Sequence, residues 1–250
     1  MSNGIFDYYG DYYDLIYKDK NYLKETKYLS QLLKNFHQKK HLDILEFGSG
    51  TGKHGNLFAK LGHKVHGIEL SQKMVSRSNI NNGFTCQQGD ITKIKLGRSF
   101  DAIMSLFHVV NYQITNKQIN SFFLNAYKHL NSRGIFIFDF WYTPAVKANM
   151  PSIRIKRVMD NNVEITRIAE PYIHEKNSRV DVKYNIFVKN LKTKLIKKFV
   201  EIHKLRHFNL LEIKNLSDKH KFKLIKSEEF VTGSILSKST WGACVVLRKK

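Results

Sequence analysis

The spacing of apolar positions divides the chain into two parts with different periods. From residue 19 to about residue 140, short apolar runs alternate with segments whose apolar residues recur every three or four positions. Such runs are typical of buried strands, and such steps are typical of helices. From 153 to 208, apolar and polar residues alternate one by one, which indicates antiparallel strands with one solvated face.

Strands that alternate with helices imply right-handed crossovers and a mostly parallel sheet, so we predict an α/β fold. The helix over 116–130 is expected to end at the turn NSRG, and a buried fifth strand follows. The alternating segment comes directly after that strand and can cover the carboxyl ends of the sheet, where open α/β sheets bind ligands. The predicted strands outside this segment are 42–47, 64–68, 85–88, 101–107, 135–140, 221–225 and 243–247, and the predicted helices are 19–38, 54–61, 72–78, 116–130 and 210–220.

The most informative stretch is LDILEFGSGTGKHG, residues 42–55. It reads as a buried strand that carries Glu46, a tight turn with Gly48, Gly50 and Gly52, and the start of a helix. Glycine has no Cβ, so the turn can adopt positive φ and a ligand can approach the bare main chain. A helix N-terminus then directs free N–H groups at that ligand. The stretch therefore predicts a site for an adenosine-bearing cofactor.

The glycines alone do not identify the cofactor, because Gly50-x-Gly52-x-x-Gly55 formally matches the dinucleotide fingerprint. The wider order favours S-adenosylmethionine. Glu69 lies seventeen residues after Gly52 at a strand end, where its carboxylate suits ribose hydroxyls, and Asp90 follows the third strand, where it can accept from an adenine amino group. A nicotinamide enzyme and a non-catalytic cofactor-binding module are the alternatives.

This order of motifs resembles the class I S-adenosylmethionine-dependent methyltransferases over residues 42–140. The N-terminal FDYYGDYYDLIYKDKNYLKE, with GTGKH, GIELSQKM, GDI, LGRSFDAI and FDFWYTP, further resembles the bacterial sugar N-methyltransferases, which dimethylate the amino group of nucleotide-linked deoxyamino sugars. The resemblance implies a Rossmann-like sheet of seven strands, the last antiparallel, with an antiparallel β insert after the fifth strand. It implies a single methyltransferase domain over 1–250, with an N-terminal helical cap of about 1–40 and a substrate-covering insert of about 150–208.

The same resemblance assigns the residues of the site. It implies that the segment with Tyr13 and Tyr22 closes over the methionine end of the cofactor, where aromatic faces suit a sulfonium. Trp141 and Tyr142 are expected to contact the methyl acceptor. The expected cofactor contacts are Tyr13, Tyr22, Glu46, Gly48, Ser49, Gly50, Gly52, His54, Glu69, Leu70, Met74, Asp90, Ile91 and Leu106.

The proton-accepting residue departs from the family pattern. In the sugar N-methyltransferases a histidine follows the fourth strand, and the segment LFHVVNYQ places Tyr112 at that position, with His108 four residues earlier. An amine nucleophile needs only modest help from a base, whereas a sugar hydroxyl needs more. Tyr112 and His108 are both candidate bases, so N- and O-methylation both stay open.

The net charge of +21 either reflects a Lys-rich composition or indicates an anionic partner. We expect a small anionic acceptor, most simply a nucleotide-linked sugar of surface-polysaccharide or secondary-metabolite biosynthesis, whose diphosphate meets the basic later half of the chain. A nucleic-acid methyltransferase is the alternative. The Asn/Asp-Pro-Pro-Tyr/Phe signature of base N-methylation is missing after the fourth strand, where the sequence is SLFH.

Other features place the protein in the cytoplasm. Cys86 and Cys244 have no paired spacing, which suits free thiols in a reducing compartment. The acidic, aromatic N-terminus resembles no secretion or transit signal, and the apolar runs are too short to span a bilayer, so no membrane partner is expected. A homodimer stays open. His174, His203 and His207 lack metal-ligand spacing and are expected at the surface or in packing, and no metal site is predicted.

Overall fold

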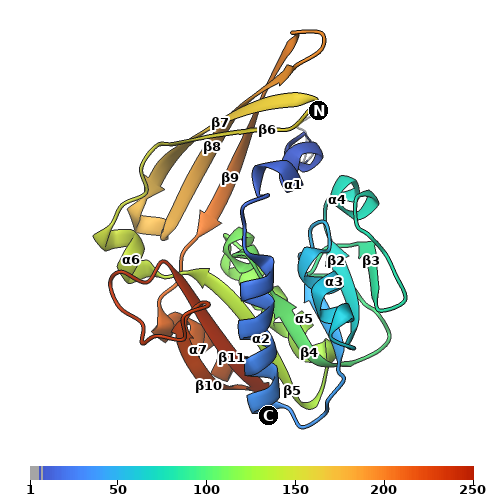
Figure 1. Ribbon diagram of the computed structural model, residues 1–250. Helices are drawn as coiled ribbons and strands as arrows, with labels where there is room; N and C mark the ends of the chain where they lie inside the picture. Colours follow the sequence, from blue (N-terminus) through green and yellow to red (C-terminus); the bar gives the residue numbers. More distant parts are fainter. Residues whose placement is uncertain (1–5, 7) are drawn as a thin grey trace.

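The computed structural model describes residue 6 and residues 8–250. The first part of the predicted N-terminal cap, residues 1–5 and 7, lies outside the described residues. Two sheets form the framework: a seven-stranded sheet, and a four-stranded sheet that stands over one end of it (Figure 1).

The large sheet has the strand order β10-β11-β5-β4-β1-β2-β3. Its strands from β5 to β3 are parallel to one another, and β11 is antiparallel to both of its neighbours. This is the class I methyltransferase topology expected from the sequence. The strands are β1 (Asp43–Phe47), β2 (Lys64–Glu69), β3 (Phe84–Gln88), β4 (Phe100–Ser105), β5 (Leu130–Trp141), β10 (Phe222–Glu229) and β11 (Gly242–Lys249).

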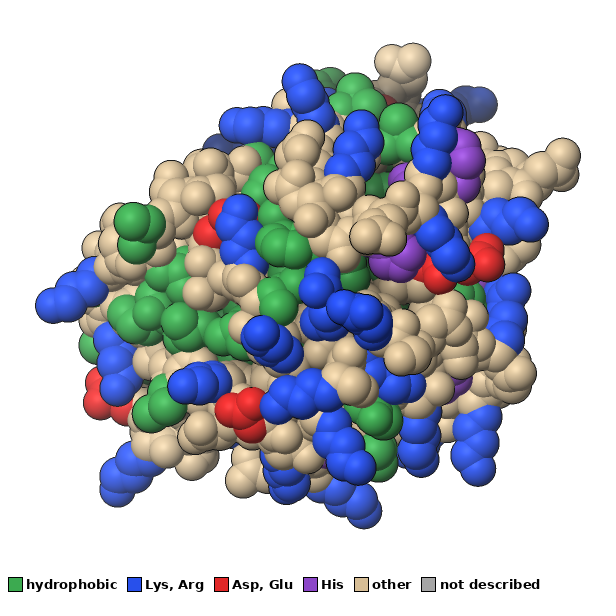
Figure 2. Space-filling model, turned by 90° about the horizontal axis from the view of Figure 1, so that it is seen from below, with side chains coloured by type: hydrophobic (Ala, Val, Ile, Leu, Met, Phe, Trp, Pro, Cys, Tyr) green, Lys and Arg blue, Asp and Glu red, His purple; other side chains and the backbone are tan. Residues whose placement is uncertain are grey.

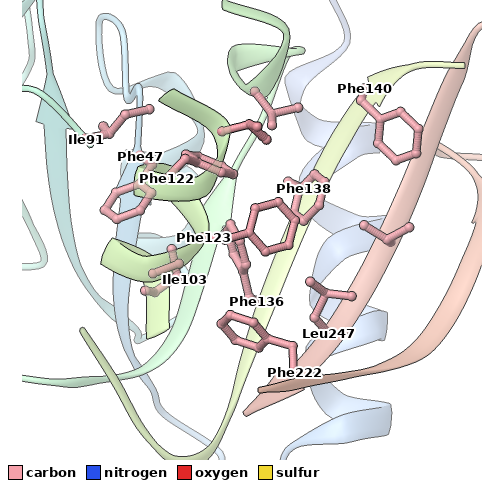
Figure 3. Close-up of a cluster of buried hydrophobic side chains, with 14 of the residues drawn as sticks. Phe47, Ile91, Ile103, Phe122, Phe123, Phe136, Phe138, Phe140, Phe222 and Leu247 are labelled. Carbon is pink, nitrogen blue, oxygen red and sulfur yellow. The ribbon is translucent and has the colours of Figure 1, made fainter. Parts of the chain in front are cut away.

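Helices cover both faces of this sheet, so its central strands are apolar on both sides. Along β5, Phe136 and Phe138 pack into one core cluster with α5 and α7 (Figure 3), and Ile135 and Ile137 pack into a second cluster with α2 and α3. The helices are α1 (Tyr13–Ile16), α2 (Tyr22–Phe36), α3 (Lys53–Lys60), α4 (Gln72–Ser76), α5 (Asn116–His129), α6 (Thr143–Ala148) and α7 (Leu210–Lys219), with short 3-10 turns η1 (Tyr9–Tyr12), η2 (Val109–Tyr112) and η3 (Glu175–Asn177).

The predicted insert is the second sheet, which is antiparallel in the order β6-β7-β8-β9. The N-terminal segment η1–α1 packs against it: Tyr9 and Ile16 share a core cluster with Ile165 and Ile186. The segment therefore lies between the insert and the large sheet (Figure 1). The strands are β6 (Arg154–Met159), β7 (Val163–His174), β8 (Arg179–Asn190) and β9 (Ile196–Arg206).

One predicted turn is wrong, and three short helical segments were not predicted. The sequence NSRG forms no separate turn, because β5 begins directly after α5, and residues 131–134 form a bulge within it, between the pairs Phe100–Leu130 and Ala102–Ile135. The unpredicted segments are α6, whose start is marked by Pro144 at its N-terminus, and the 3-10 turns η2 and η3, whereas η1–α1 falls within the predicted N-terminal helical cap.

Candidate active site

A cavity of about 690 Å³ lies at the carboxyl ends of β1, β2 and β4, under the insert and the N-terminal segment. Residues far apart in sequence meet in its wall. The predicted residues that line it are Tyr13, Tyr22, Glu46, Gly48, Ser49, Gly50, His54, Glu69, Leu70, Met74, Asp90, Ile91, Leu106, His108, Tyr112 and Trp141.

Two predicted residues are not in the cavity wall. Gly52 precedes α3 with a φ of 76°, and a Cβ there would come within 2.4 Å of the Phe84 ring, so this glycine shapes the turn from behind. Tyr142 packs against the core cluster under β5, and its N–H donates to the Trp241 carbonyl. The expectation that Tyr142 contacts the acceptor is therefore not supported.

The glycine turn presents bare main chain to the cavity at Gly50. Its φ of 56° lies in the left-handed region, and a Cβ added there would meet nothing nearer than the Met74 sulfur at 3.9 Å. The Gly50 N–H donates to Glu69 Oε2 at 2.9 Å. The turn and the end of β2 thus form one continuous wall.

Glu69 is nearly buried, and it is held by backbone donors on both oxygens. Its Oε1 accepts from the Ser71 N–H at 2.9 Å and its Oε2 accepts from Gly50. Burial raises the pKa of Glu69, and these N–H groups oppose the rise. A carboxylate has about four lone-pair positions, so each oxygen keeps one for a vicinal diol such as that of ribose.

Asp90 lines the cavity, but its carboxylate is already engaged. Oδ1 accepts from the Thr92 N–H at 2.8 Å and from the Thr92 hydroxyl at 2.7 Å, and Oδ2 lies 2.9 Å from Lys93 Nζ. Burial acts to raise its pKa, but these hydrogen bonds hold it below the usual value. An adenine amino group would have to share these oxygens.

Glu46 is 2% exposed, and its Oε2 has no hydrogen-bond partner among the described residues. Burial raises the pKa of Glu46 to about 8; the nearby Gly55 N–H opposes the rise and Glu69 adds to it. His54 Nδ1 lies 3.9 Å from Glu46 Oε1, and His54 Nε2 lies 2.7 Å from Glu25 Oε2. A buried oxygen without a partner needs a donor, and an amino-acid ammonium would supply it.

The residues present therefore fit S-adenosylmethionine. Glu69 is suited to the ribose, Glu46 to the ammonium, and neutral aromatic rings to the sulfonium. Burial raises the pKa of Tyr13 well above its ordinary value, so its ring stays an uncharged phenol. Tyr13 and Tyr17 lie with ring centroids 4.7 Å apart, and the Tyr17 ring lies 5.1 Å from that of Phe107.

The loop after β4 is bent sharply toward the cavity. Phe107 and His108 have φ of 63° and 62°, a strained conformation for residues with side chains. His108 Nδ1 lies 2.7 Å from Asp139 Oδ2, and the His108 ring lies 6.2 Å from that of Trp141. Burial acts to raise the pKa of Asp139, but His108 holds it below the usual range. The loop therefore holds an imidazole against a buried carboxylate.

Tyr112, the other candidate base, lies in η2. Its hydroxyl is 2.8 Å from His203 Nδ1, and burial raises its pKa well above the ordinary value. The phenol therefore stays protonated at neutral pH, which favours His108 as the proton acceptor.

Sequence reasoning missed three residues here: Asp139, Glu201 and His203. Asp139 is the one acidic residue in the buried run IFIFDFW, and that position was a usable signal. His203, expected at the surface or in packing, is 1% exposed and lines the cavity. His207 is buried and bonded to the Thr143 hydroxyl.

Two features are absent from the described part of the chain. No helix there is long and apolar enough to cross a membrane. No group of three or more His, Cys, Asp or Glu side chains is arranged there to hold a metal ion.

Known proteins resemble this chain in sequence. Residues 44–134 match the family model described as a methyltransferase domain. The chain is 29% identical over 145 residues to the dTDP-3-amino-3,4,6-trideoxy-alpha-D-glucopyranose N,N-dimethyltransferase of Streptomyces venezuelae, a match that covers 56% of this chain and 60% of that enzyme. It is 24% identical over 184 residues to the dTDP-3-amino-3,6-dideoxy-alpha-D-glucopyranose N,N-dimethyltransferase of Streptomyces fradiae, over 71% of each chain.

Solved structures share the fold over nearly the whole length. DesVI of Streptomyces venezuelae has a TM-score of 0.80 at 21% identity and covers 97% of this chain and 98% of its own. The sugar N-methyltransferase KedS8 of Streptoalloteichus has a TM-score of 0.82 at 15% identity and covers 100% and 96%. Residues 44–134 thus match a methyltransferase domain, the strand order and the solved structures give the class I methyltransferase fold, and the chain is similar to the bacterial S-adenosylmethionine-dependent dTDP-sugar N,N-dimethyltransferases.

Proposed function

We propose that this protein transfers the methyl group of S-adenosylmethionine to a nitrogen, or to an oxygen, of a nucleotide-linked sugar. The observation that carries the proposal is that one cavity is lined by Glu69 and bare Gly50 main chain and also by His108, whose Nδ1 contacts the buried Asp139 carboxylate. The first pair suits a nucleoside, and the second suits a nucleophile that must lose a proton.

When bound, S-adenosylmethionine supplies a methyl group that is already activated by the sulfonium. The protein's part is to align the acceptor, exclude water and remove one proton. Asp139 lies against His108 Nδ1, so His108 Nε2 is left for the acceptor. A proton that leaves the nucleophile passes to this nitrogen, and Asp139 stabilises the imidazolium that forms.

The acceptor class rests on the dTDP-sugar enzymes to which the chain is similar. Its match spans 60% of the length of the Streptomyces venezuelae enzyme, and the insert and the N-terminal segment enclose the cavity as a small acceptor requires. Trp141, beside His108, offers a flat apolar surface to a sugar ring.

Basic side chains are not confined to the end of the molecule that carries the insert. Figure 2 views the lower end of the molecule as drawn in Figure 1, away from the insert, and shows Lys and Arg side chains spread over that face. Basic side chains are therefore present on a face that is remote from the insert, and part of the charge of +21 does not lie at the cavity.

A competition experiment separates the two acceptor classes. The protein saturated with S-adenosylhomocysteine is titrated with dTDP, and in parallel with a short single-stranded RNA, at two salt concentrations. We expect saturable dTDP binding that RNA does not displace at physiological salt. Tight RNA binding with a steep salt dependence, and no dTDP binding, would overturn it.

A further inference from the structure

Two residues of the insert form a hydrogen-bonded chain with Tyr112. The Tyr112 hydroxyl lies 2.8 Å from His203 Nδ1, and His203 Nε2 lies 3.1 Å from Glu201 Oε2. Glu201 and His203 are both on β9 and are 7% and 1% exposed. These hydrogen bonds therefore connect the insert to the cavity wall.

Glu201 can only accept hydrogen bonds in this chain. Its Oε1 takes the N–H groups of Tyr8 and Tyr9 at 3.2 and 2.9 Å, and its Oε2 takes the N–H of Phe6 at 3.0 Å. Burial acts to raise the pKa of Glu201, but His203 and these backbone donors hold it below the usual value. The group is therefore a carboxylate, which has no proton to give.

The direction of every hydrogen bond from Tyr112 to His203 and Glu201 follows from the ionised state of Glu201. Because Glu201 only accepts, the neutral His203 ring must carry its proton on Nε2, and Nδ1 is then a bare acceptor. Tyr112 must donate its hydroxyl proton to Nδ1. The Tyr112 oxygen is left with lone pairs alone to offer the cavity, whereas a protonated His203 would reverse this and turn the hydroxyl outward as a donor.

The other neighbours of His203 leave this pairing undisturbed. The ring centroids of Phe6, Tyr9 and Tyr184 lie 5.0, 5.7 and 4.8 Å from that of the imidazole. All three rings are T-shaped to it and form aromatic contacts with it. The Tyr9 hydroxyl accepts from Arg167 Nη1 at 2.7 Å, and that guanidinium lies 5.0 Å from the Tyr184 ring. Glu201 is the one acidic group hydrogen-bonded to the imidazole among the described residues.

We propose that His203 is a specificity-determining positioning residue, which acts through Tyr112 to make this wall of the cavity a hydrogen-bond acceptor. The wall then favours a methyl acceptor that presents an O–H or N–H group at this point, because a ligand without one leaves the phenol oxygen unpaired. Because Glu201 also holds the N-terminal segment, the wall is complete only when that segment is docked. The inference rests on the proposed function.

Two measurements on the full chain test it. In the first, a long-range proton–nitrogen NMR spectrum of the protein bound to S-adenosylhomocysteine is recorded at pH 8, and the His203 signal is identified by its loss in His203→Asn. In the second, calorimetry follows binding of dTDP-3-amino-3,6-dideoxy-α-D-glucopyranose to the same complex in the wild type, Tyr112→Phe and His203→Asn. His207→Asn is the matched control, because this buried histidine of the same region is outside the cavity wall.

We expect the Nε2–H tautomer and about tenfold weaker sugar binding in Tyr112→Phe and in His203→Asn, the loss of roughly one hydrogen bond. Binding of S-adenosylhomocysteine should stay unchanged, and His207→Asn should bind the sugar like the wild type. An Nδ1–H or doubly protonated ring overturns the polarity. Unchanged sugar affinity in Tyr112→Phe overturns the recognition role, even if His203→Asn fails to fold. No sugar binding by the wild type contradicts the proposed function and with it this role, while the tautomer still decides the polarity.

Discussion

His108 Nδ1 lies 2.7 Å from Asp139 Oδ2. The backbone N–H of His108 donates to the same carboxylate, with its nitrogen 3.2 and 3.3 Å from the two oxygens. The two residues come from the loop after β4 and from the buried strand β5. A left-handed conformation at a residue such as His108 costs on the order of 1–3 kcal/mol, which the contact with Asp139 offsets. The contact holds the strained loop in place and fixes the His108 imidazole at the cavity.

Asp139→Asn should lower kcat by roughly 10²- to 10⁴-fold, because the imidazole loses the partner that fixes its tautomer and stabilises its charge. S-adenosylhomocysteine binding, measured by calorimetry, should change little. Asp101→Asn is the matched control: Asp101 is also a buried aspartate, at the start of β4, and is bonded to Lys39. That variant should lower the melting temperature and leave kcat intact. Equal kcat in Asp139→Asn and the wild type would exclude this pair from the reaction.

Glu69→Ala should weaken S-adenosylmethionine binding on the order of 100-fold, because hydrogen bonds to a charged group contribute roughly 1.5–3 kcal/mol each. Asp90→Ala should weaken S-adenosylmethionine binding by less than about tenfold, since the Asp90 oxygens are already bonded to Thr92 and Lys93. Equilibrium dialysis with labelled cofactor measures both constants. A larger loss in Asp90→Ala than in Glu69→Ala would contradict the assignment of the ribose to Glu69.

Glu46 should couple cofactor binding to proton release. Its ordinary pKa of 4.5 rises to about 8 in the fold, so folding takes up a proton between these values and its contribution to stability falls as pH rises through that window. A ligand ammonium beside Glu46 favours the carboxylate, so binding at pH 7 should release protons and affinity should rise from pH 6 to pH 7. Calorimetry in buffers of different ionisation enthalpy detects the release, and Glu46→Gln should abolish it. Equal proton release by the wild type and Glu46→Gln would refute the role of Glu46.

Asp14 should hold the N-terminal segment over the cavity more strongly than Asp11 does. Asp14 Oδ1 accepts from the Thr51 hydroxyl at 2.7 Å, and Thr51 is 5% exposed. The ion pair between Asp11 and Lys73 is about 40% exposed on each side, and such pairs contribute little. Asp14→Ala should therefore raise hydrogen exchange over residues 9–16 and weaken cofactor binding several-fold, whereas Asp11→Ala should do neither. Identical exchange in the two variants would show that Thr51 does not hold the segment.

Local patterns were enough to predict much of the fold. The period-two alternation predicted the insert, and the apolar runs predicted the strands of the large sheet within a few residues at most ends. The glycine turn and Glu69 were predicted because their chemistry depends on neighbours close in sequence. The NSRG segment was misassigned because a bulge inside a strand and a turn between elements use the same residues.

The acceptor side depends on contacts that no local pattern carries. His203 lies 91 positions from its partner Tyr112, and Glu201 lies more than 190 positions from the N–H groups that it accepts. On β9, His203 looks like any residue of an alternating strand. Only the docking of the insert over the large sheet brings it into the cavity wall.

The most direct test of the account is mass spectrometry of dTDP-3-amino-3,6-dideoxy-α-D-glucopyranose incubated with this protein and S-adenosylmethionine labelled in its methyl group. We predict that one or two labelled methyl groups appear on the sugar, at the amino nitrogen or at a hydroxyl, with matching formation of S-adenosylhomocysteine. An unlabelled sugar, from protein that binds both compounds, would contradict the proposed methyl transfer to nucleotide-linked sugars.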